Sequence, residues 1–442
     1  MADKVSVISL GCPKNLVNSE QMLYLLSEAG FDIVSEPEDS DAVIVNTCGF
    51  IDSAKSEAID VIIEMGELKK AGALKRIIVT GCLSQRYSDD ILKELPEIDS
   101  ILGTGSYDDI VAAVRGALEG KPVALFGDIN APITETGRIV STGPAYAFLR
   151  IAEGCNNCCA FCVIPSIRGK YRSRDMDSIV EEAAALVKTG VKELIVIAQD
   201  ITRYGTDLYG KRSLSELLRR LCKIKGDFWI RLHYLYPDQF DDELIETIAS
   251  QDKVLSYLDI PIQHINDSIL KRMNRRGTGN DIRVLFKKLR ERIPNLVIRT
   301  SLIVGLPGET EAEFEELCLF LREAKIERAG VFVFSPEEGT PAAAMTDRCD
   351  EEEAQRRCDI VMELQAEIMD AWSETVIGKT LRVLCEGYDE EIGMQLGRSW
   401  ADSPDIDGVV CFSGDCAVGE FAEVTIREIV DGEWIGVTVG GE

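Results

Sequence analysis

The sequence predicts a multidomain α/β protein made of a parallel α/β N-terminal domain, a partial (β/α)6 barrel and a small antiparallel β-barrel. Three observations predict this class. Short β-branched runs alternate with helical patterns in the first third, six more strand–helix pairs follow, and the chain after Gly378 contains only short strands and turns. Because 442 residues exceed one ordinary domain, we expect three domains, at residues 1–135, 141–375 and 376–442.

The first domain is predicted from strands that each precede a helical pattern. The strand patterns are KVSVISL (4–10), DAVIVNT (41–47) and KRIIVTG (75–81), and the helical patterns cover 16–30 and 53–72. Strand starts recur about every 35 residues, which fits βα units of a parallel sheet. A stretch rich in Gly, Thr and Pro, residues 131–144, is predicted to be a linker.

The central domain is predicted from six strand patterns separated by amphipathic helices. The strand patterns are at residues 148–154, 193–200, 229–237, 257–264, 297–307 and 330–336. Six such units form part of a barrel, whose active site lies at the carboxyl ends of the strands. A charged helix, 351–375, then leads to the small barrel, whose clearest strand patterns are at 380–388, 406–414, 420–429 and 433–439.

Composition limits the class of function. The start MADKVSVISLGC has no apolar signal region, and no apolar run approaches the ~18 residues of a membrane span, so we expect a cytoplasmic protein without a membrane partner. Fourteen cysteines in a reducing compartment suggest metal binding in place of disulfides. The net charge of −28 repels a phosphate backbone, suits a basic protein partner and favours a monomer.

The segment GCNNCCAFCVIP places Cys155, Cys159 and Cys162 in a CxxxCxxC arrangement. These positions would also share one face of a helix, but a helix would spread the outer sulfurs over roughly 10 Å. Gly154, two asparagines and Pro165 disfavour that helix. We therefore predict a loop that gathers three thiolates around one 4Fe–4S cluster, with a structural zinc site or buried thiols as the alternative.

Three cysteines on a four-iron cluster leave one iron open for a substrate. In radical enzymes that iron holds the amino and carboxylate groups of S-adenosylmethionine (SAM), and the motif follows the first predicted barrel strand, where active-site residues belong. Cys158 offers a fourth thiol inside the motif. Because it breaks the spacing we interpret it as a bystander, and it remains the rival ligand.

A second trio ends three predicted strands: Cys12 follows VSVISLG, Cys48 follows AVIVNT and Cys82 follows RIIVTG. In a parallel sheet all three lie at the carboxyl edge, where ligands bind and helix N-termini favour thiolates. We predict a second, auxiliary cluster, with three unrelated buried cysteines as the alternative. The other cysteines show no ligand-like grouping beyond Cys411 and Cys416, and His233 and His264 face either the active site or the core.

With both trios in place, the chain resembles the methylthiotransferases, a radical SAM family, over nearly its whole length. The resemblance rests on SLGCPKNLVNSE, NTCGFIDSAKSEAID, GCNNCCAFCVIPSIRGKYRSR, AQDITRYGTD, LHYLYP, DIPIQHINDSILKRMNRRG, GLPGETEAEF and GRSWADSPDIDGVV. It implies a methylthiotransferase domain, a radical SAM barrel and a TRAM domain. It also implies an auxiliary 4Fe–4S cluster on the second trio and the radical-generating cluster on the first.

The resemblance further implies a transferase that uses SAM both as methyl donor and as radical source. The branch of the family most similar to this chain modifies the β-carbon of an aspartate in ribosomal protein uS12, giving 3-methylthioaspartate. Such enzymes need an electron donor, and uS12 would be met free or in the small ribosomal subunit.

Candidate SAM contacts come from position alone, and each could equally be structural. They are Gln199 and Asp200 after the second barrel strand, Gln263 near the end of the fourth, Gly305 in the fifth, and Phe161 between two ligand cysteines.

The chain departs from the family pattern at three positions. Asn157 and Cys158 stand where His-Arg is common, which leaves the environment of that cluster open. Asn18 replaces a usual aspartate, and we expect little effect because amide and carboxylate have similar shapes.

The rival substrate is tRNA, as in enzymes similar to MiaB. After Gly378 the chain has four basic and fourteen acidic residues, a net charge of −10. An RNA-binding barrel should be basic, so the tail favours a protein rich in Lys and Arg and disfavours nucleic acid other than through the ribosome. Two alternatives remain. The acidic surface could serve only solubility, and the protein could bind metal without catalysis.

Overall fold

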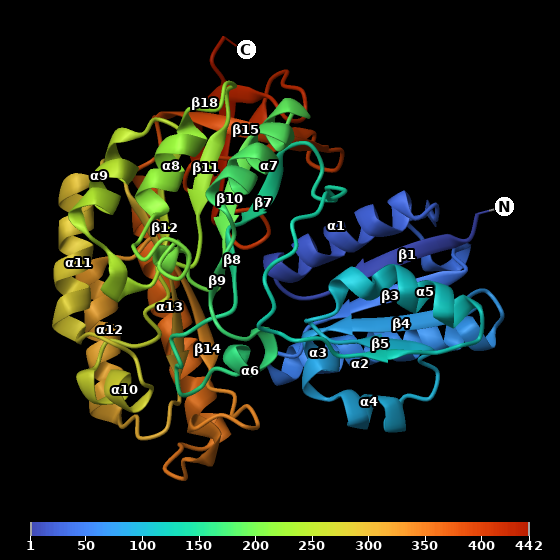
Figure 1. The fold of residues 1–442 in the computed structure, drawn as a ribbon. Helices are drawn as coiled ribbons and strands as arrows, with labels where there is room; N and C mark the ends of the chain where they lie inside the picture. Colours follow the sequence, from blue (N-terminus) through green and yellow to red (C-terminus); the bar gives the residue numbers. More distant parts are fainter. Residues whose placement is uncertain (1, 441–442) are drawn as a thin grey trace. The chain divides into compact units, whose positions relative to one another are not determined.

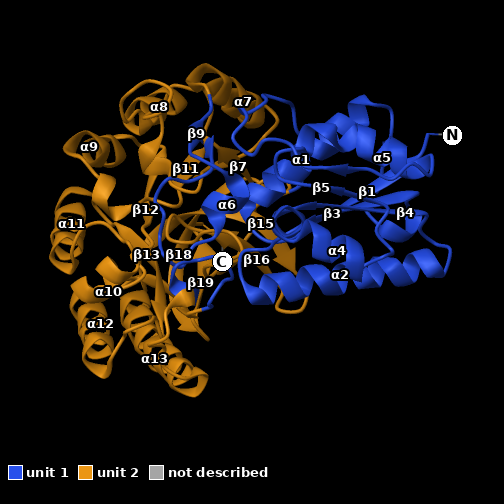
Figure 2. Cartoon of the chain, turned by 60° about the horizontal axis from the view of Figure 1, so that its bottom comes forward, with its two compact units in different colours: residues 1–141, 152–174, 335–343 blue, residues 142–151, 175–334, 344–442 orange. Residues whose placement is uncertain are grey.

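The first third of the chain forms a six-stranded sheet in which every strand pair is parallel. The computed structural model describes residues 2–440. The sheet belongs to the first of two compact units, which comprises residues 1–141, 152–174 and 335–343 (Figure 2). In spatial order its strands are β2 (Asp32–Ile33), β1 (Lys4–Ser9), β3 (Ala42–Thr47), β4 (Arg76–Gly81), β5 (Ser100–Leu102) and β6 (Ala124–Leu125).

Helices cover both faces of this sheet. They are α1 (Pro13–Glu28), α2 (Asp52–Lys70), α3 (Cys82–Arg86), α4 (Ser88–Glu94) and α5 (Ile110–Leu118), with one-turn helices at Pro37–Asp39 and Tyr107–Asp109. Alternate residues of β3 face opposite sides: Ile44 packs with Met22 of α1 and with α5, whereas Val45 packs with Ile62 of α2. Figure 1 shows the same arrangement, with α1 and α5 on one face and α2 on the other.

The predicted linker is irregular, but part of it packs against α1. Residues 131–141 form no helix or strand. Arg138 pairs with buried Glu20 of α1 at 3.0 Å, and the Ser141 backbone N–H donates to the same carboxylate at 2.8 Å. The end of this segment is therefore held to the first unit.

The second unit comprises residues 142–151, 175–334 and 344–442. It contains an open sheet of six parallel strands, in the order β14 (Arg328–Val333), β13 (Val297–Val304), β12 (Val254–Asp259), β11 (Trp229–Leu232), β10 (Glu193–Ile197) and β7 (Tyr146–Arg150). Since β7 and β14 are the two edges of this sheet, the barrel is partial, as predicted.

The helices of the barrel surround its strands (Figure 2). They are α7 (Met176–Lys188), α8 (Leu214–Cys222), α9 (Asp242–Ser250), α10 (Asp267–Arg272), α11 (Gly279–Arg292), α12 (Glu311–Ala324) and α13 (Glu351–Glu374), with one-turn helices at Ile201–Arg203, Pro237–Gln239 and Ala342–Ala344. Side-chain caps fix several of their starts: Asp175 accepts from two backbone N–H groups of α7, and Thr278 and Asp281 form a capping box on α11.

The C-terminal strands close into a five-stranded barrel, ordered β15 (Thr380–Asp389), β16 (Met394–Arg398), β17 (Val410–Ser413), β19 (Glu433–Thr438) and β18 (Phe421–Val430). Four of its pairings are antiparallel, and β17 with β19 is parallel. The predicted fold class is confirmed in all three parts, with this one parallel pairing as a difference. The helices of residues 2–440 are all too short or too polar to cross a lipid bilayer.

Buried charges join the small barrel to the central sheet. The carboxylate of Glu193 in β10 contacts Arg231 of β11 at 2.5 Å and Arg398 of β16 at 2.6 Å, and all three side chains are almost fully buried. Burial opposes ionisation of Glu193, but the two arginine charges outweigh it and lower its pKa. Arg231 also donates to the Trp400 and Ser399 carbonyls at 2.7 and 3.2 Å, so the segment between β16 and β17 is tied to the sheet.

Both histidines lie in buried surroundings. His233 Nε2 is 3.0 Å from Ser403 Oγ, which adds a contact between β11 and the same segment. The Asn266 backbone N–H donates to His264 Nδ1 at 3.1 Å, and burial lowers the pKa of His264 to about 3. His233 is therefore a satisfied core histidine. His264 is buried too, but among the described residues its Nε2 has no hydrogen-bond partner and lies 3.7 Å from Glu309, so its role stays a prediction.

We expect Arg231→Met to destabilise the second unit by about 3–5 kcal/mol, because it removes a partner of a buried carboxylate. All four tryptophans lie in this unit, at positions 229, 372, 400 and 434, so urea unfolding followed by tryptophan fluorescence reports on it alone. Arg219→Met is the matched control, since Arg219 pairs with Glu243 at the surface, and it should cost no more than about 1 kcal/mol. Equal losses in the two variants would contradict the importance of the buried network.

Candidate metal centre

Cys12, Cys48 and Cys82 lie at the carboxyl edge of three adjacent parallel strands, as predicted. Cys12 is the residue before α1 and follows β1, Cys48 directly follows β3, and Cys82 directly follows β4 as the first residue of α3. The order β1, β3, β4 makes their strands neighbours. The parallel sheet thus brings together three thiols that are far apart in sequence.

Two residues, Gly11 and Asn15, allow these strand ends to lie close together. Gly11 has a φ of +84°, and a Cβ built on it would lie 2.6 Å from Cys48 Cβ and 2.9 Å from Cys48 Sγ. The loop after β1 can therefore pass Cys48 only because residue 11 has no side chain. The Asn15 amide donates to the carbonyls of Leu10, Asn46 and Thr47 at 2.8, 3.3 and 3.1 Å, which ties the end of β1 to the end of β3.

The three thiols have different acidities. Burial raises the pKa of Cys12, but the charges of Lys14 and Arg168 and two backbone N–H groups outweigh it, so its pKa lies below the usual value. Burial raises the pKa of Cys48 to about 11 and also raises the pKa of Cys82, which Arg168 partly offsets. Positive charge therefore favours the thiolate of Cys12 and opposes the effect of burial at Cys82, and the thiolate is the form that binds iron.

The segment that carries Cys155, Cys159 and Cys162 is a loop, as predicted. It leaves a two-residue ladder between β8 (Ala152–Glu153) and β9 (Arg172–Ser173), and helix begins again only at α6 (Ile164–Arg168). Gly154 has a φ of +77°, and a Cβ there would lie 2.1 Å from the Lys170 carbonyl oxygen. The loop therefore packs directly against the segment that returns from α6.

Hydrogen bonds shape the cysteine loop. The Cys155 N–H donates to the Gly169 carbonyl at 3.1 Å, the Cys162 N–H donates to the Cys159 carbonyl at 3.0 Å, and the Asn157 N–H lies 3.4 Å from Cys155 Sγ. A backbone N–H aimed at a cysteine sulfur is a common feature of iron–sulfur sites. Cys158 differs from its neighbours, since it is exposed and has a left-handed φ of 53°, while the other three cysteines are partly buried.

Arg168 connects this loop to the second trio, Cys12, Cys48 and Cys82, and the sequence did not reveal it. Its guanidinium contacts Cys82, Asn15, Asn18 and Glu153, and Cys82 also packs with Val163 and Ile167. In the structure Asn15 and Asn18 are buried polar residues one helical turn apart in α1, and their burial cannot be seen in the sequence. Such a pair needs a buried hydrogen-bonding partner.

The five candidate SAM contacts occupy varied positions. Asp200 is fully buried and caps the helix Ile201–Arg203, accepting from Thr202 and pairing with Arg203 at 3.3 Å, which is a structural role. Gln263 has a φ of 71°, and its backbone pairs with Ser301 and Ile303 of β13. Gln199 is the second residue after β10. Gly305 directly follows β13 and has a φ of +73°. Phe161 is half-buried in the cysteine loop. Their contact with SAM stays a prediction.

Within residues 2–440, no three His, Cys, Asp or Glu side chains converge closely enough for a single metal ion. A zinc ion, for comparison, needs sulfur at about 2.3 Å. A four-iron cluster interposes iron and sulfide between its cysteines, so its ligands stand further apart. Three features fit such clusters. There are two sets of three thiols, Gly11 and Gly154 stand where a Cβ would collide, and N–H groups point at the sulfurs of Cys155 and Cys82.

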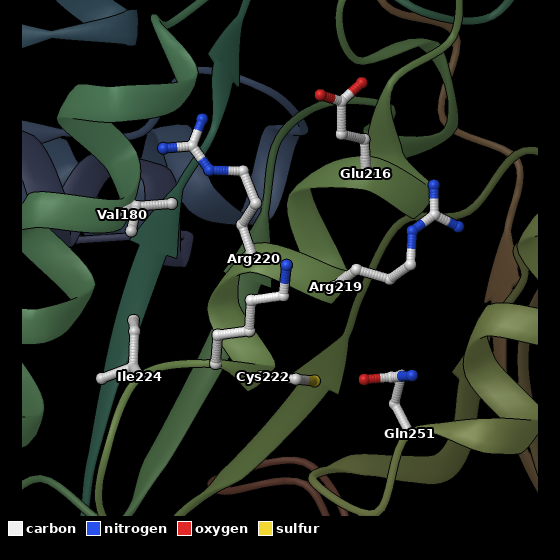
Figure 3. A pocket seen from close by; sticks show the side chains of 8 residues that line it. Val180, Glu216, Arg219, Arg220, Cys222, Ile224 and Gln251 are labelled. Carbon is white, nitrogen blue, oxygen red and sulfur yellow. The ribbon is translucent and has the colours of Figure 1, made fainter.

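An open pocket of about 690 Å³ lies elsewhere, among α7, α8 and the residue after α9 (Figure 3). It contains none of the candidate residues. Its arginines already have acidic partners, Arg219 with Glu243 and Arg220 with Asp177. It is a surface cleft between barrel helices and adds nothing to the metal centre.

Comparison with known proteins gives three matches in chain order. Residues 4–103 match the model of uncharacterized protein family UPF0004, residues 149–321 that of the radical SAM superfamily, and residues 377–439 that of the TRAM domain. The fold agrees with a solved radical SAM methyltransferase, TsrM from Kitasatospora setae, at a TM-score of 0.56 and 14% identity over 77% of this chain and 74% of that one. The chain is therefore a radical SAM protein with a C-terminal TRAM barrel.

Nearly full-length relatives narrow the class. A protein of Lachnoclostridium phytofermentans named ribosomal protein uS12 methylthiotransferase RimO is 48% identical over 98% of this chain and 99% of its own length. A protein of the same name from a Thermoanaerobacter species is 47% identical over the same shares. This chain belongs to the RimO family of methylthiotransferases, so the resemblance found in the sequence is confirmed. SAM and 4Fe–4S clusters are the cofactors that this membership implies.

We expect Gly11→Ala to lose the iron of one cluster, about half of the total after anaerobic reconstitution, because the new Cβ would collide with Cys48. Iron and acid-labile sulfide counted per chain measure this loss. Gly30→Ala is the matched control: Gly30 also has a positive φ, +89°, but a Cβ there meets nothing within 4 Å, so full iron should remain. Full iron in both variants would show that binding of this cluster does not depend on the space that Gly11 leaves beside Cys48.

Proposed function

We propose that this protein is a radical SAM methylthiotransferase that adds a methylthio group to the β-carbon of an aspartate in ribosomal protein uS12, giving 3-methylthioaspartate. The observation that carries the proposal is the presence of two cysteine trios in one compact unit, in a chain similar to uS12 methylthiotransferases from end to end. The alternative is a tRNA methylthiotransferase similar to MiaB.

In this proposal the two trios have separate tasks. Cys155, Cys159 and Cys162 would hold the cluster whose electron is needed to cleave SAM to methionine and a 5′-deoxyadenosyl radical. Cys12, Cys48 and Cys82 would hold the auxiliary cluster, the source of the sulfur to be transferred. Cys158 is exposed and breaks the spacing, so we leave it out of both ligand sets.

Residues next to Cys12, Cys48 and Cys82 position these cysteines. Asn15 ties the ends of β1 and β3 together, and Gly11 leaves room for Cys48. The hydrophobic contacts of Cys82 with Val163 and Ile167 shield the Cys82 side chain from water. Exclusion of water protects a radical from side reactions.

The surface of the TRAM barrel supports a protein substrate. Within residues 379–440, nine acidic side chains are exposed but only two basic ones, Lys379 and Arg427. The exposed acids are Glu390, Glu391, Asp405, Asp415, Glu420, Glu423, Glu428, Asp431 and Glu433. TRAM domains are associated with RNA, but a surface of this sign repels a phosphate backbone and attracts a protein rich in Lys and Arg.

The wider setting completes the proposal. We place the enzyme in the cytoplasm as a monomer, served by an electron donor, and acting on uS12 either free or within the small ribosomal subunit. The proposal also includes three domains, at residues 1–135, 141–375 and 376–442.

Reduced, reconstituted protein incubated with SAM should add a methylthio group to uS12 and not to a tRNA anticodon arm, because the acidic TRAM surface selects the basic protein. Mass spectrometry of both substrates, mixed in one reaction, measures the choice. The control is the variant in which Cys155, Cys159 and Cys162 are all alanine, which should modify neither. Modification of the RNA alone would overturn the substrate and favour the MiaB-like alternative.

A further inference from the structure

Arg168 is a buried cation between the two cysteine trios. It is the last residue of α6, six positions after Cys162, and only 3% of its surface is exposed. Its Nη2 donates to Asn15 Oδ1 at 2.8 Å and lies 3.4 Å from Cys82 Sγ, while its Nη1 donates to Asn18 Oδ1 at 2.8 Å. One guanidinium thus contacts a strand-end cysteine and two residues of α1.

Arg168 has one charged partner and two neutral ones. Its guanidinium contacts the neutral side chains of Asn15 and Asn18 at 2.8 Å and the carboxylate of Glu153 at 3.3 Å. Asn15 cannot turn away, because its amide nitrogen is held by three backbone carbonyls. The guanidinium is therefore fixed in orientation, and its positive charge acts on Cys82 through a buried, weakly screened medium.

We propose that Arg168 is a positioning residue for the auxiliary cluster, and that its charge raises the reduction potential of that cluster. The inference rests on the proposed function, which assigns Cys12, Cys48 and Cys82 to the cluster. An N–H group directed at a ligand sulfur and a nearby cation both favour the reduced cluster, which carries one more negative charge. The step concerned is the gain of one electron from an external reductant, and no bond forms or breaks in it.

Asn18 sets how strongly this charge acts. Its side-chain oxygen accepts from Arg168 at 2.8 Å without bringing a negative charge. An aspartate at the same position would place a carboxylate against the guanidinium and offset most of its field. Position 18 therefore tunes the potential through its hydrogen bond to Arg168.

The test measures the midpoint potential of the auxiliary cluster alone. The background is the full chain with Cys155, Cys159 and Cys162 replaced by alanine, reconstituted and titrated with dithionite while the reduced cluster is followed by electron paramagnetic resonance. In Arg168→Met the ratio of reduced to oxidised cluster at a fixed potential should fall about tenfold, a shift of about 59 mV to more negative values. Asn18→Asp should shift it in the same direction, and Arg168→Lys should restore most of the wild-type value.

Arg76→Met is the matched control, since Arg76 starts the strand whose other end precedes Cys82, about 20 Å away. The midpoint potential of the auxiliary cluster should not change in Arg76→Met. An unchanged potential in both Arg168→Met and Asn18→Asp, with full iron, overturns the inference and leaves the proposed function standing. If Arg168→Met loses its iron, the midpoint potential of Asn18→Asp tests the inference instead, and an unchanged potential in that variant overturns it. If the background itself binds no iron, the cysteine assignment fails, and the role of Arg168 fails with it.

Discussion

Parallel pairing of β1, β3 and β4 is the constraint on which the metal centre depends. Each strand ends just before a cysteine, and only a parallel arrangement puts all three ends at one edge. If any one strand ran the other way, its cysteine would lie at the opposite edge of the sheet. The remaining features of the site refine this placement. Gly11 allows close approach, Asn15 ties two strand ends together, and Arg168 brings positive charge from the segment that follows Cys162.

The second unit is organised by buried charge in a similar way. Glu193 lies between Arg231 and Arg398, and Tyr257 donates to Asp407 at 2.6 Å, so the segment between β16 and β17 has several polar ties to the central sheet. Buried ion pairs contribute little net stability, but they penalise any other alignment of the two parts. They give the acidic TRAM surface a defined attachment to the barrel within this unit.

Strong hydrophobic patterns made much of the architecture predictable. Each long strand expected in the first two domains is present, and so are the cysteine loop and the alignment of Cys12, Cys48 and Cys82. The strands that escaped prediction are short, such as β2 and β6 with two residues each, or weakly patterned, such as β16 with the sequence MQLGR. So few residues show no alternation to detect.

Arg168 could not be predicted, because nothing in SIRGKYRSR separates it from Arg172, which is partly buried, or from Arg174, which is buried but lies away from the cysteines in sequence. Its burial depends on contacts with residues about 150 positions away. The small effect expected of Asn18 has to be revised for the same reason, since its side chain meets that arginine. His233 was ambiguous in sequence, and its partner Ser403 lies 170 positions further along the chain.

The most direct test of the account is an anomalous-scattering map, recorded at the iron edge, from crystals of the anaerobically reconstituted protein. The account predicts two separate iron peaks in every molecule. Cys12, Cys48 and Cys82 should surround one peak, and Cys155, Cys159 and Cys162 the other, with Cys158 bound to neither. A single peak, or a cluster held by Cys158 in place of Cys159, would contradict it.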